Sequence, residues 1–220
     1  MKGLLTKDME LIKGNIKNFL LVYMIAIIVG SSAGPSFLIS YVSILAAVMS
    51  MNTITNDEMN HGMAFILTFP VNRKEYIKEK YIFGTCFIAG SWLIAVLVAL
   101  AINFSGFRTV SLEELYFSAI AGIFVALLAE AVFFPVQLKY GCETGRIALF
   151  VMVFGITGLA YLGEKICEML HIDFVPVIEL GKKILALEKP VCSGMLGVLI
   201  LLILLISCTI AVKIMEKKEY

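Results

Sequence analysis

Acidic side chains, histidines and cysteines are the groups in this sequence that could take part in chemistry. The two histidines, His61 and His171, lie in polar segments that the topology derived below puts on opposite sides of a membrane. They therefore cannot share a zinc site or a catalytic triad. A phosphate-binding loop of the form GxxxxGK[ST] does not occur in the sequence. We expect no metal site, no cofactor and no catalytic centre on this chain.

Glu130 is the one acidic or basic residue in the interior of the predicted apolar spans. A carboxylate in the middle of a bilayer is costly, so this side chain should face other helices or water. The same helix face carries a small residue at every fourth position before it, at Ser118, Gly122 and Ala126. Small residues on such a stripe allow another helix to approach closely. Glu130 is thus an element of a transport pathway, a contact between helices, or a structural glutamate satisfied by a neighbour.

Two of the five cysteines, Cys167 and Cys192, fall in segments that the topology places outside the membrane. That compartment is oxidising, so a disulfide between them is possible. A shared compartment does not bring two residues together, and the pairing stays open.

The composition excludes most classes of soluble protein. The chain has 220 residues, of which 60% are hydrophobic and 16% are charged, and its mean hydropathy is +0.94. Soluble domains are about 45–50% apolar and about 25% charged. A soluble enzyme and a nucleic-acid-binding protein are therefore excluded, and we expect an integral membrane protein.

Long apolar windows define an all-α polytopic membrane protein with six transmembrane helices between residues 18 and 213. A membrane helix needs about 20 apolar residues, and the first window is long enough for two spans. Gly34-Pro35-Ser36 divides it, because proline disfavours a continuing helix. The predicted spans are about 18–33, 36–54, 81–104, 114–138, 147–163 and 190–212.

The distribution of basic residues gives the orientation. With the N-terminus in the cytoplasm, the external segments contain only five of the 18 Lys and Arg residues, and the rest are cytoplasmic. The five are Arg108, Lys165, Lys182, Lys183 and Lys189. The excess of positive charge on the cytoplasmic side predicts that both termini are cytoplasmic, including a tail at 214–220.

Residues 1–17 predict an amphipathic helix at the cytoplasmic interface. Met1, Leu5, Met9, Ile12 and Ile16 recur at spacings of three and four, and lysines lie off this stripe. The helix either contacts a cytosolic partner or only anchors the topology. The external segment 164–189 is also rich in apolar residues, and it is either a re-entrant segment or a surface loop on the bilayer.

The longest cytoplasmic loop, residues 55–80, has the pattern of two helices joined by a turn. Asp57 and Glu58 suit the first turn of a helix, where acids meet the positive end of the dipole. Pro70 should end that helix. Asn72 and Glu75 then form a capping-box-like pair for a second helix that continues into the third span. This pattern predicts an ordered loop that serves as a docking surface for another protein.

This organisation resembles the small membrane subunits of bacterial type-2 ABC exporters, the permeases that export phenol-soluble modulins and bacteriocins. The most specific stretch is an acidic Asp57-Glu58 pair, then Leu67-Thr68-Phe69-Pro70-Val71-Asn72-Arg73-Lys74, then Lys80-Tyr81 at the entry to the third span. It is similar to the family's acidic residue, "LP-V-S-R" turn and Lys-Tyr pair. Phe69 and Asn72 depart from the common leucine and serine.

The resemblance implies a chain that dimerises, or pairs with a sister permease, in the bacterial cytoplasmic membrane. Each copy would bind a separate cytosolic ABC ATPase, which holds the ATP and magnesium. The cargo would be an amphipathic peptide or another hydrophobic molecule. The residues implied for ATPase coupling come from the 55–80 loop and the loop after span four: Asp57, Glu58, His61, Met63, Phe65, Arg73, Lys74, Tyr140 and Glu143.

A second class of membrane protein also has about six spans and a similar chain length. It is the stand-alone membrane subunit that captures a small molecule, such as a vitamin, for an energy-coupling importer. That class needs no docking loop between spans two and three. Co-purification with a cytosolic ATPase, and an ATPase gene next to this one, would distinguish the two.

Overall fold

The computed structural model describes residues 2–59, 72–106, 109–141, 147, 151 and 189–217. These residues form long helices and no strand, so the predicted all-α class is confirmed for them. The helices are α1 (Lys2–Gly14), α2 (Ile16–Ala33), α3 (Pro35–Glu58), α5 (Arg73–Phe104), α6 (Leu112–Tyr140) and α9 (Lys189–Lys217).

Four of these helices are long and apolar enough to cross a membrane: α3, α5, α6 and the Ser193–Lys217 part of α9. The predicted first span corresponds to α2, whose apolar stretch, Leu20–Gly30, is shorter. The predicted fifth span, 147–163, lies outside the described residues apart from positions 147 and 151. Six spans and the orientation of the termini remain predictions.

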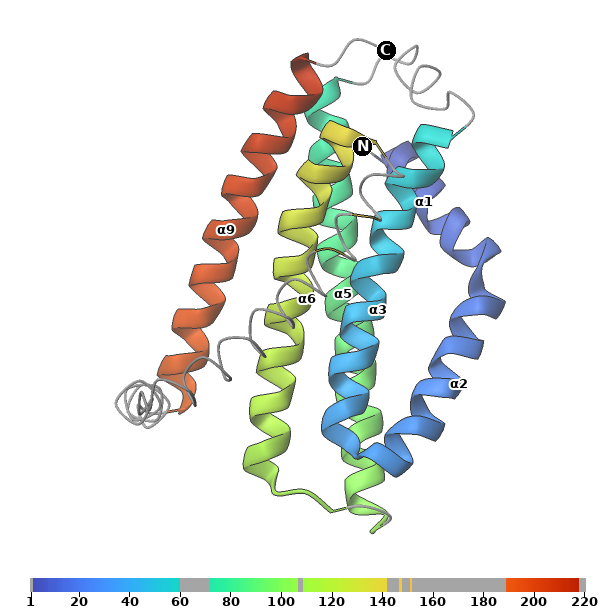
Figure 1. Ribbon diagram of the computed structural model, residues 1–220, viewed down its shortest axis with the longest axis vertical. Coiled ribbons are helices and arrows are strands. Elements are labelled where there is room, and N and C mark those ends of the chain that lie inside the picture. The colour runs from blue at the N-terminus through green and yellow to red at the C-terminus, as the bar shows by residue number, and fades with distance from the viewer. Residues whose placement is uncertain are drawn as a thin grey trace, which may run out of the picture.

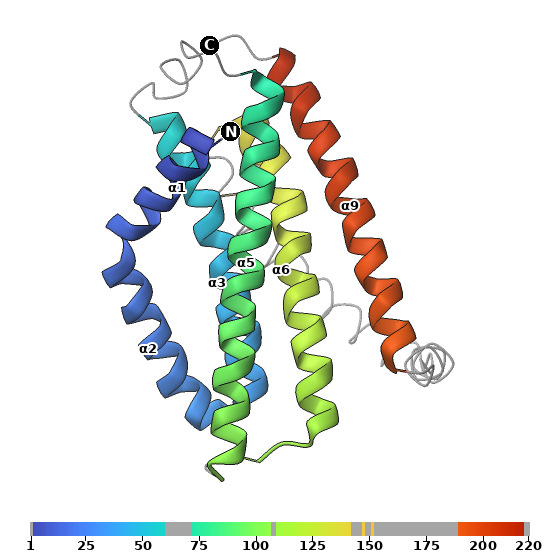
Figure 2. The ribbon, with the colours of Figure 1, turned by 180° about the vertical axis from the view of Figure 1, so that it is seen from behind.

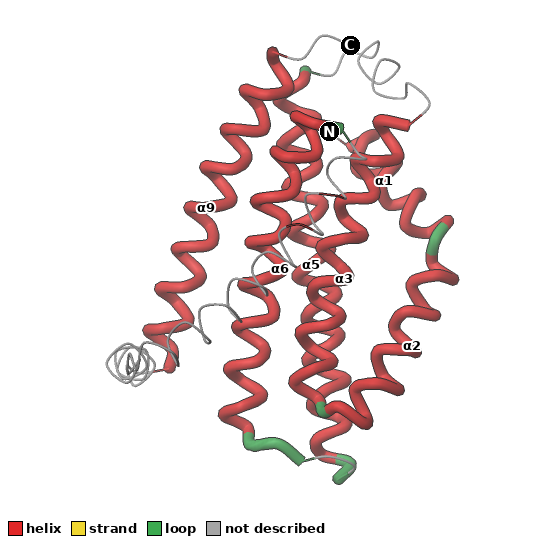
Figure 3. The backbone as a smooth tube through the Cα atoms, in the orientation of Figure 1, coloured by secondary structure: helices red, strands yellow, loops and turns green. Residues whose placement is uncertain are grey.

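The helices form an elongated bundle (Figure 1). α3, α5 and α6 pack together at its centre, α9 lies against α6 and α5, and α2 lies against α3. The view from behind shows α2 diverging from the central helices and α1 crossing the bundle near one end (Figure 2). That end also holds the last turns of α3, α6 and α9 and the first turn of α5 (Figure 3).

Local sequence explains where the helices turn. Gly34 has a φ of 112°, which favours glycine, and Pro35 occupies the first turn of α3. α2 therefore ends at Ala33, the chain reverses direction at Gly34, and α3 begins at Pro35. At the other end of the bundle, α5 begins at Arg73 and continues without interruption to Phe104. Asn72 precedes it, but its side chain makes no capping hydrogen bond there, so the expected capping box is wrong.

The core combines alanines with large apolar residues such as Ile39 and Phe134, and other large apolar side chains point outward. Buried alanines occur in every central helix, among them Ala46, Ala99 and Ala126. Leu20 of α2 and Leu205 of α9 are by contrast 62% and 64% exposed. Alanines allow close helix packing, and exposed leucines suit contact with lipid chains. A surface this rich in exposed large apolar side chains is typical of a protein embedded in a bilayer.

Candidate functional site

A buried ionic contact connects α1, α3 and α5 at the end of the bundle where α3 stops. The Lys80 ammonium of α5 lies 2.8 Å from Asp57 Oδ2 in α3 and also donates a hydrogen bond to Asp8 Oδ2 in α1. The exposed fractions of Lys80, Asp8 and Asp57 are 1%, 0% and 5%. Buried charges of this kind are tolerated only when they are paired and hydrogen-bonded.

Lys7 and Tyr76 complete what we call the ionic cluster, defined as Lys7, Asp8, Asp57, Tyr76 and Lys80. Lys7 Nζ bonds Asp57 Oδ1 and lies 3.4 Å from Asp8 Oδ1. The Tyr76 hydroxyl donates to Asp57 Oδ2 at 2.9 Å, and the Lys80 ammonium lies 5.4 Å from the centroid of the Tyr76 ring. The cluster contains two lysines and two aspartates, whose ion pairs and hydrogen bonds join three helices.

The position of Asp57 and Glu58 corrects the sequence-based expectation. They lie in the last turn of α3 rather than in the first turn of a separate helix. The negative end of the helix dipole disfavours acids there. Lys7 and Lys80 offset this cost at Asp57, which is buried rather than offered to a partner. Asp57 is therefore a buried contact between α1, α3 and α5, and its role in ATPase coupling remains a prediction.

Arg73 and Lys74 connect the first turn of α5 to the end of α9. Arg73 Nη1 donates to the carbonyl oxygens of Met215 and Glu216 at 3.0 and 3.2 Å. Lys74 Nζ lies 3.2 Å from Glu216 Oε1. Basic groups are favourable at the C-terminal end of a helix, where carbonyls lack partners. Both residues were predicted to contact an ATPase, and the structure shows them bound to α9 within the chain.

Glu130 lies at the contact between α5 and α6. Its side chain is 0% exposed, and Thr85 Oγ1 donates to its Oε2 at 3.2 Å. A Cβ added to Gly84 would stand 2.3 Å from Glu130 Oε1 and 3.2 Å from Phe134 Cζ. Glycine is thus what allows the two helices to meet around this carboxyl group. Of the expected roles, the geometry favours a contact between helices.

The small-residue stripe before Glu130 faces α3. A Cβ added to Gly122 would lie 3.2 Å from Ile39 Cγ2 and 3.5 Å from Ser43 Oγ. Ala126 is fully buried on the same face. Ser118 is half-buried, and its hydroxyl donates to the carbonyl of Leu115 in its own helix. The predicted close approach of a helix is therefore made by α3, whereas Glu130 turns toward α5.

Comparison with known families identifies the chain. Its sequence matches the family described as ABC-2 family transporter protein over residues 3–216. The chain belongs to this family. It is therefore a multi-pass permease subunit of an ABC transporter, and the family implies an ABC ATPase partner and a lipid bilayer. Neither the curated proteins nor the solved structures give a match.

Several predicted site residues of this permease lie outside the described residues: His61, Met63, Phe65, Glu143 and Cys167. The side chain of Cys192 is not described either, so the disulfide remains untested. Tyr140 is described. It stands in the last turn of α6, is 57% exposed, and its ring centroid lies 4.9 Å from the Lys139 ammonium.

Two further polar contacts join the helices of the permease. Gln137 Nε2 of α6 donates to Thr55 Oγ1 of α3 at 2.8 Å. The hydroxyl oxygens of Tyr81 in α5 and Ser207 in α9 are 2.6 Å apart, and Ser207 also donates to the carbonyl of Ala131 in α6. Within the part of the chain that the structure describes, no group of three His, Cys, Asp or Glu side chains is placed to hold a metal.

Proposed function

We propose that this permease exports amphipathic or hydrophobic cargo, in particular antimicrobial or cytolytic peptides, across a bacterial cytoplasmic membrane. It would work as a dimer, or with a sister permease, together with cytosolic ATPase subunits that bind ATP and magnesium. The observation that carries this proposal is the ionic cluster. Its members Asp57 and Tyr76 stand on either side of residues 60–71, within the loop 55–80 that the family resemblance assigns to ATPase contact.

The ionic cluster gives a physical route from that segment to the membrane helices. Asp57 precedes the segment on α3, and Lys80 follows it on α5, while Asp8 adds α1. Separating one helix from the others would leave a buried charge without its partner, at a cost of about 3–5 kcal/mol. The three helices are therefore expected to move together when the ATPase changes shape.

Arg73 and Lys74 connect the group formed by α1, α3 and α5 to α9. Their bonds to the last turn of α9 join the beginning of α5 to a helix that also packs on α6 and, around Tyr81, on α5. Lys74 and Glu216 are 63% and 45% exposed, so their ion pair adds little by itself. The guanidinium contacts with two backbone carbonyls fix the relative position of the two helix ends.

The interior polar groups of the spans support an apolar cargo. In the described spans, Thr85 donates to Glu130 and Tyr81 bonds Ser207, so these polar groups are used in contacts between helices. A pathway between two such permeases would have mostly apolar walls. This suits a peptide with an apolar face better than a sugar or an ion. Family membership also favours an ATPase-coupled permease over a stand-alone subunit that captures a small molecule.

The test is peptide transport in vesicles that contain the full-length permease and its co-expressed ATPase. Inside-out vesicles should accumulate a fluorescent amphipathic helical peptide when ATP and magnesium are supplied. A variant ATPase that binds but does not hydrolyse ATP should abolish accumulation and retain co-purification. Tight binding of a small molecule by the permease alone, without a co-purifying ATPase, would favour the importer class and overturn the proposal.

A further inference from the structure

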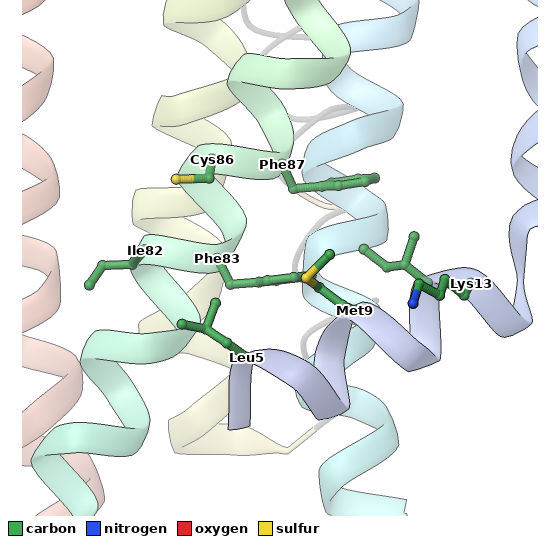
Figure 4. Close-up of a pocket in the computed structure, with 8 residues that line it drawn as sticks. Leu5, Met9, Lys13, Ile82, Phe83, Cys86 and Phe87 are labelled. Carbon is green, nitrogen blue, oxygen red and sulfur yellow. The ribbon is translucent and has the colours of Figure 1, made fainter. Parts of the chain in front are cut away.

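An open groove of about 350 Å³ lies between α1 and α5 (Figure 4). This volume falls in the range of about 300–1,000 Å³ that is typical of small-molecule sites. Lys13 is the one charged residue among those that line the groove. The apolar walls come from Leu5, Met9 and Ile12 of α1 and from Ile82, Phe83 and Phe87 of α5.

The groove exists because the face of α1 that packs on the bundle is not the face that carries its apolar stripe. Leu4 and Asp8, four residues apart, are the buried side chains of α1. Asp8 is held there by Lys80. The stripe with Leu5 and Met9 is therefore only partly covered by α5, and Met9 stays 53% exposed. On the opposite wall, Ile82 is 50% exposed.

The charge at the groove fits an anionic occupant. The Lys13 side chain is 62% exposed, and its partner is Glu10, one turn earlier and equally exposed. Such a surface pair is weak and competes poorly with a phosphate. A lysine with a long apolar stem can lie along the groove and hold its ammonium at the level of lipid headgroups. Basic amphipathic helices bind anionic membranes in this way.

We propose that the groove binds one acyl chain of an anionic phospholipid, with its phosphate at Lys13 Nζ. The chain would contact the apolar side chains of α1 and α5, and the headgroup would lie beside the last turn of α1. Lys7 and Asp8 of the same helix belong to the ionic cluster, so the lipid would bind next to the contact that joins α1 to α3 and α5. This site is independent of the cargo and of the direction of transport.

Photo-crosslinking of the full-length permease in nanodiscs tests this site. The probes are phosphatidylglycerol and phosphatidylcholine, each with a diazirine in one acyl chain, and labelled peptides are mapped by mass spectrometry. Labelling at α1 and at 82–87 is divided by labelling of the exposed face of α9, which reports bulk lipid. We expect phosphatidylglycerol to label the groove in preference to phosphatidylcholine.

Lys13→Gln should reduce that preference about fivefold, the factor expected for one lysine at an anionic surface. The matched control is Lys213→Gln, which removes an exposed lysine of α9 and should leave the preference unchanged. Cys86→Trp, which adds bulk to the groove wall, should lower labelling by both lipids. Because Lys13 is exposed, its variant should fold and give a readable result.

Equal groove labelling by the two lipids, or an unchanged preference in Lys13→Gln, would overturn the proposal. So would groove labelling by both lipids that is no stronger than labelling of the α9 face, because the groove would then hold no lipid chain of its own. Loss of the preference in Lys13→Gln with full labelling in Lys213→Gln supports it.

Discussion

The Lys80 ammonium lies 2.8 Å from Asp57 Oδ2, and both side chains are nearly inaccessible to solvent. The two residues are on different helices, α3 and α5, and residues 60–71 connect them along the chain. An ATPase that acts on this connecting segment would act on two helices that are already bonded to each other. The ion pair is therefore the structural basis of the coupling role that we propose for this end of the bundle.

Lys80→Met should destabilise the permease strongly. It removes the ammonium shared by Asp8 and Asp57 and leaves buried carboxylates short of a partner. We expect a loss of about 3–5 kcal/mol in the free energy of unfolding, measured by equilibrium denaturation in detergent. Lys74→Met is the control, because its ion pair with Glu216 is exposed and should contribute at most about 1 kcal/mol. Equal effects of the two substitutions would show that the ionic cluster is not a buried network.

Gly84→Ala should weaken the contact between α5 and α6. The new Cβ would stand 2.3 Å from Glu130 Oε1, so the carboxyl group or the helix must shift. Overpacking of this kind costs about 1–3 kcal/mol. Gly90→Ala is the matched control, because a Cβ there meets nothing within 4 Å and alanine favours helix.

A double-mutant cycle locates the cause of the Gly84 effect. In a Glu130→Ala background the clash with the carboxyl group is absent, so Gly84→Ala should cost less than in the wild type. The same thermal or chemical unfolding measurement applies to all four variants. Strict additivity would mean that Glu130 is not the group that meets Gly84.

Tyr81→Phe should cost about 1 kcal/mol in unfolding free energy, the usual contribution of one hydrogen bond. The substitution removes the hydroxyl that bonds Ser207 across α5 and α9, while the packing of the ring on Phe134 at 5.1 Å is retained. Tyr41→Phe is a suitable comparison, because that ring stacks on Phe37 at 5.7 Å and keeps this contact. A smaller loss for Tyr81→Phe than for Tyr41→Phe would contradict the assigned bond.

Sequence patterns could predict the all-α class and the helix turn at Gly34-Pro35, because both depend on local properties. Apolar runs report helices in lipid, and a glycine followed by proline ends one helix and starts the next. The small-residue stripe through Gly122 was also visible, because every fourth residue of a helix lies on one face. The helix that packs on this stripe could not be predicted, because the spacing of small residues carries no information about their partner.

The ionic cluster could not be predicted in this way. Asp8 and Lys80 are 72 residues apart, and no local pattern links an acid in a basic N-terminal helix to a particular lysine. The expected helix start at Asp57 and Glu58 is wrong because acids suit a first helical turn, whereas α3 continues through both residues to its end at Glu58. A helix held by tertiary ion pairs can end against its dipole preference, and single-sequence reasoning does not include those pairs.

Peptide transport by an Asp57→Asn permease tests the central claim most directly. The full-length variant is co-expressed with its ATPase, reconstituted in inside-out vesicles and assayed below its unfolding temperature. Glu75→Gln, which changes an exposed acid in the first turn of α5, is the matched control. We predict that the ATPase still co-purifies with Asp57→Asn while ATP-dependent peptide uptake falls about tenfold, a coupling free energy of about 1.4 kcal/mol. Uptake equal to that of Glu75→Gln and the wild type would contradict a coupling role for the ionic cluster.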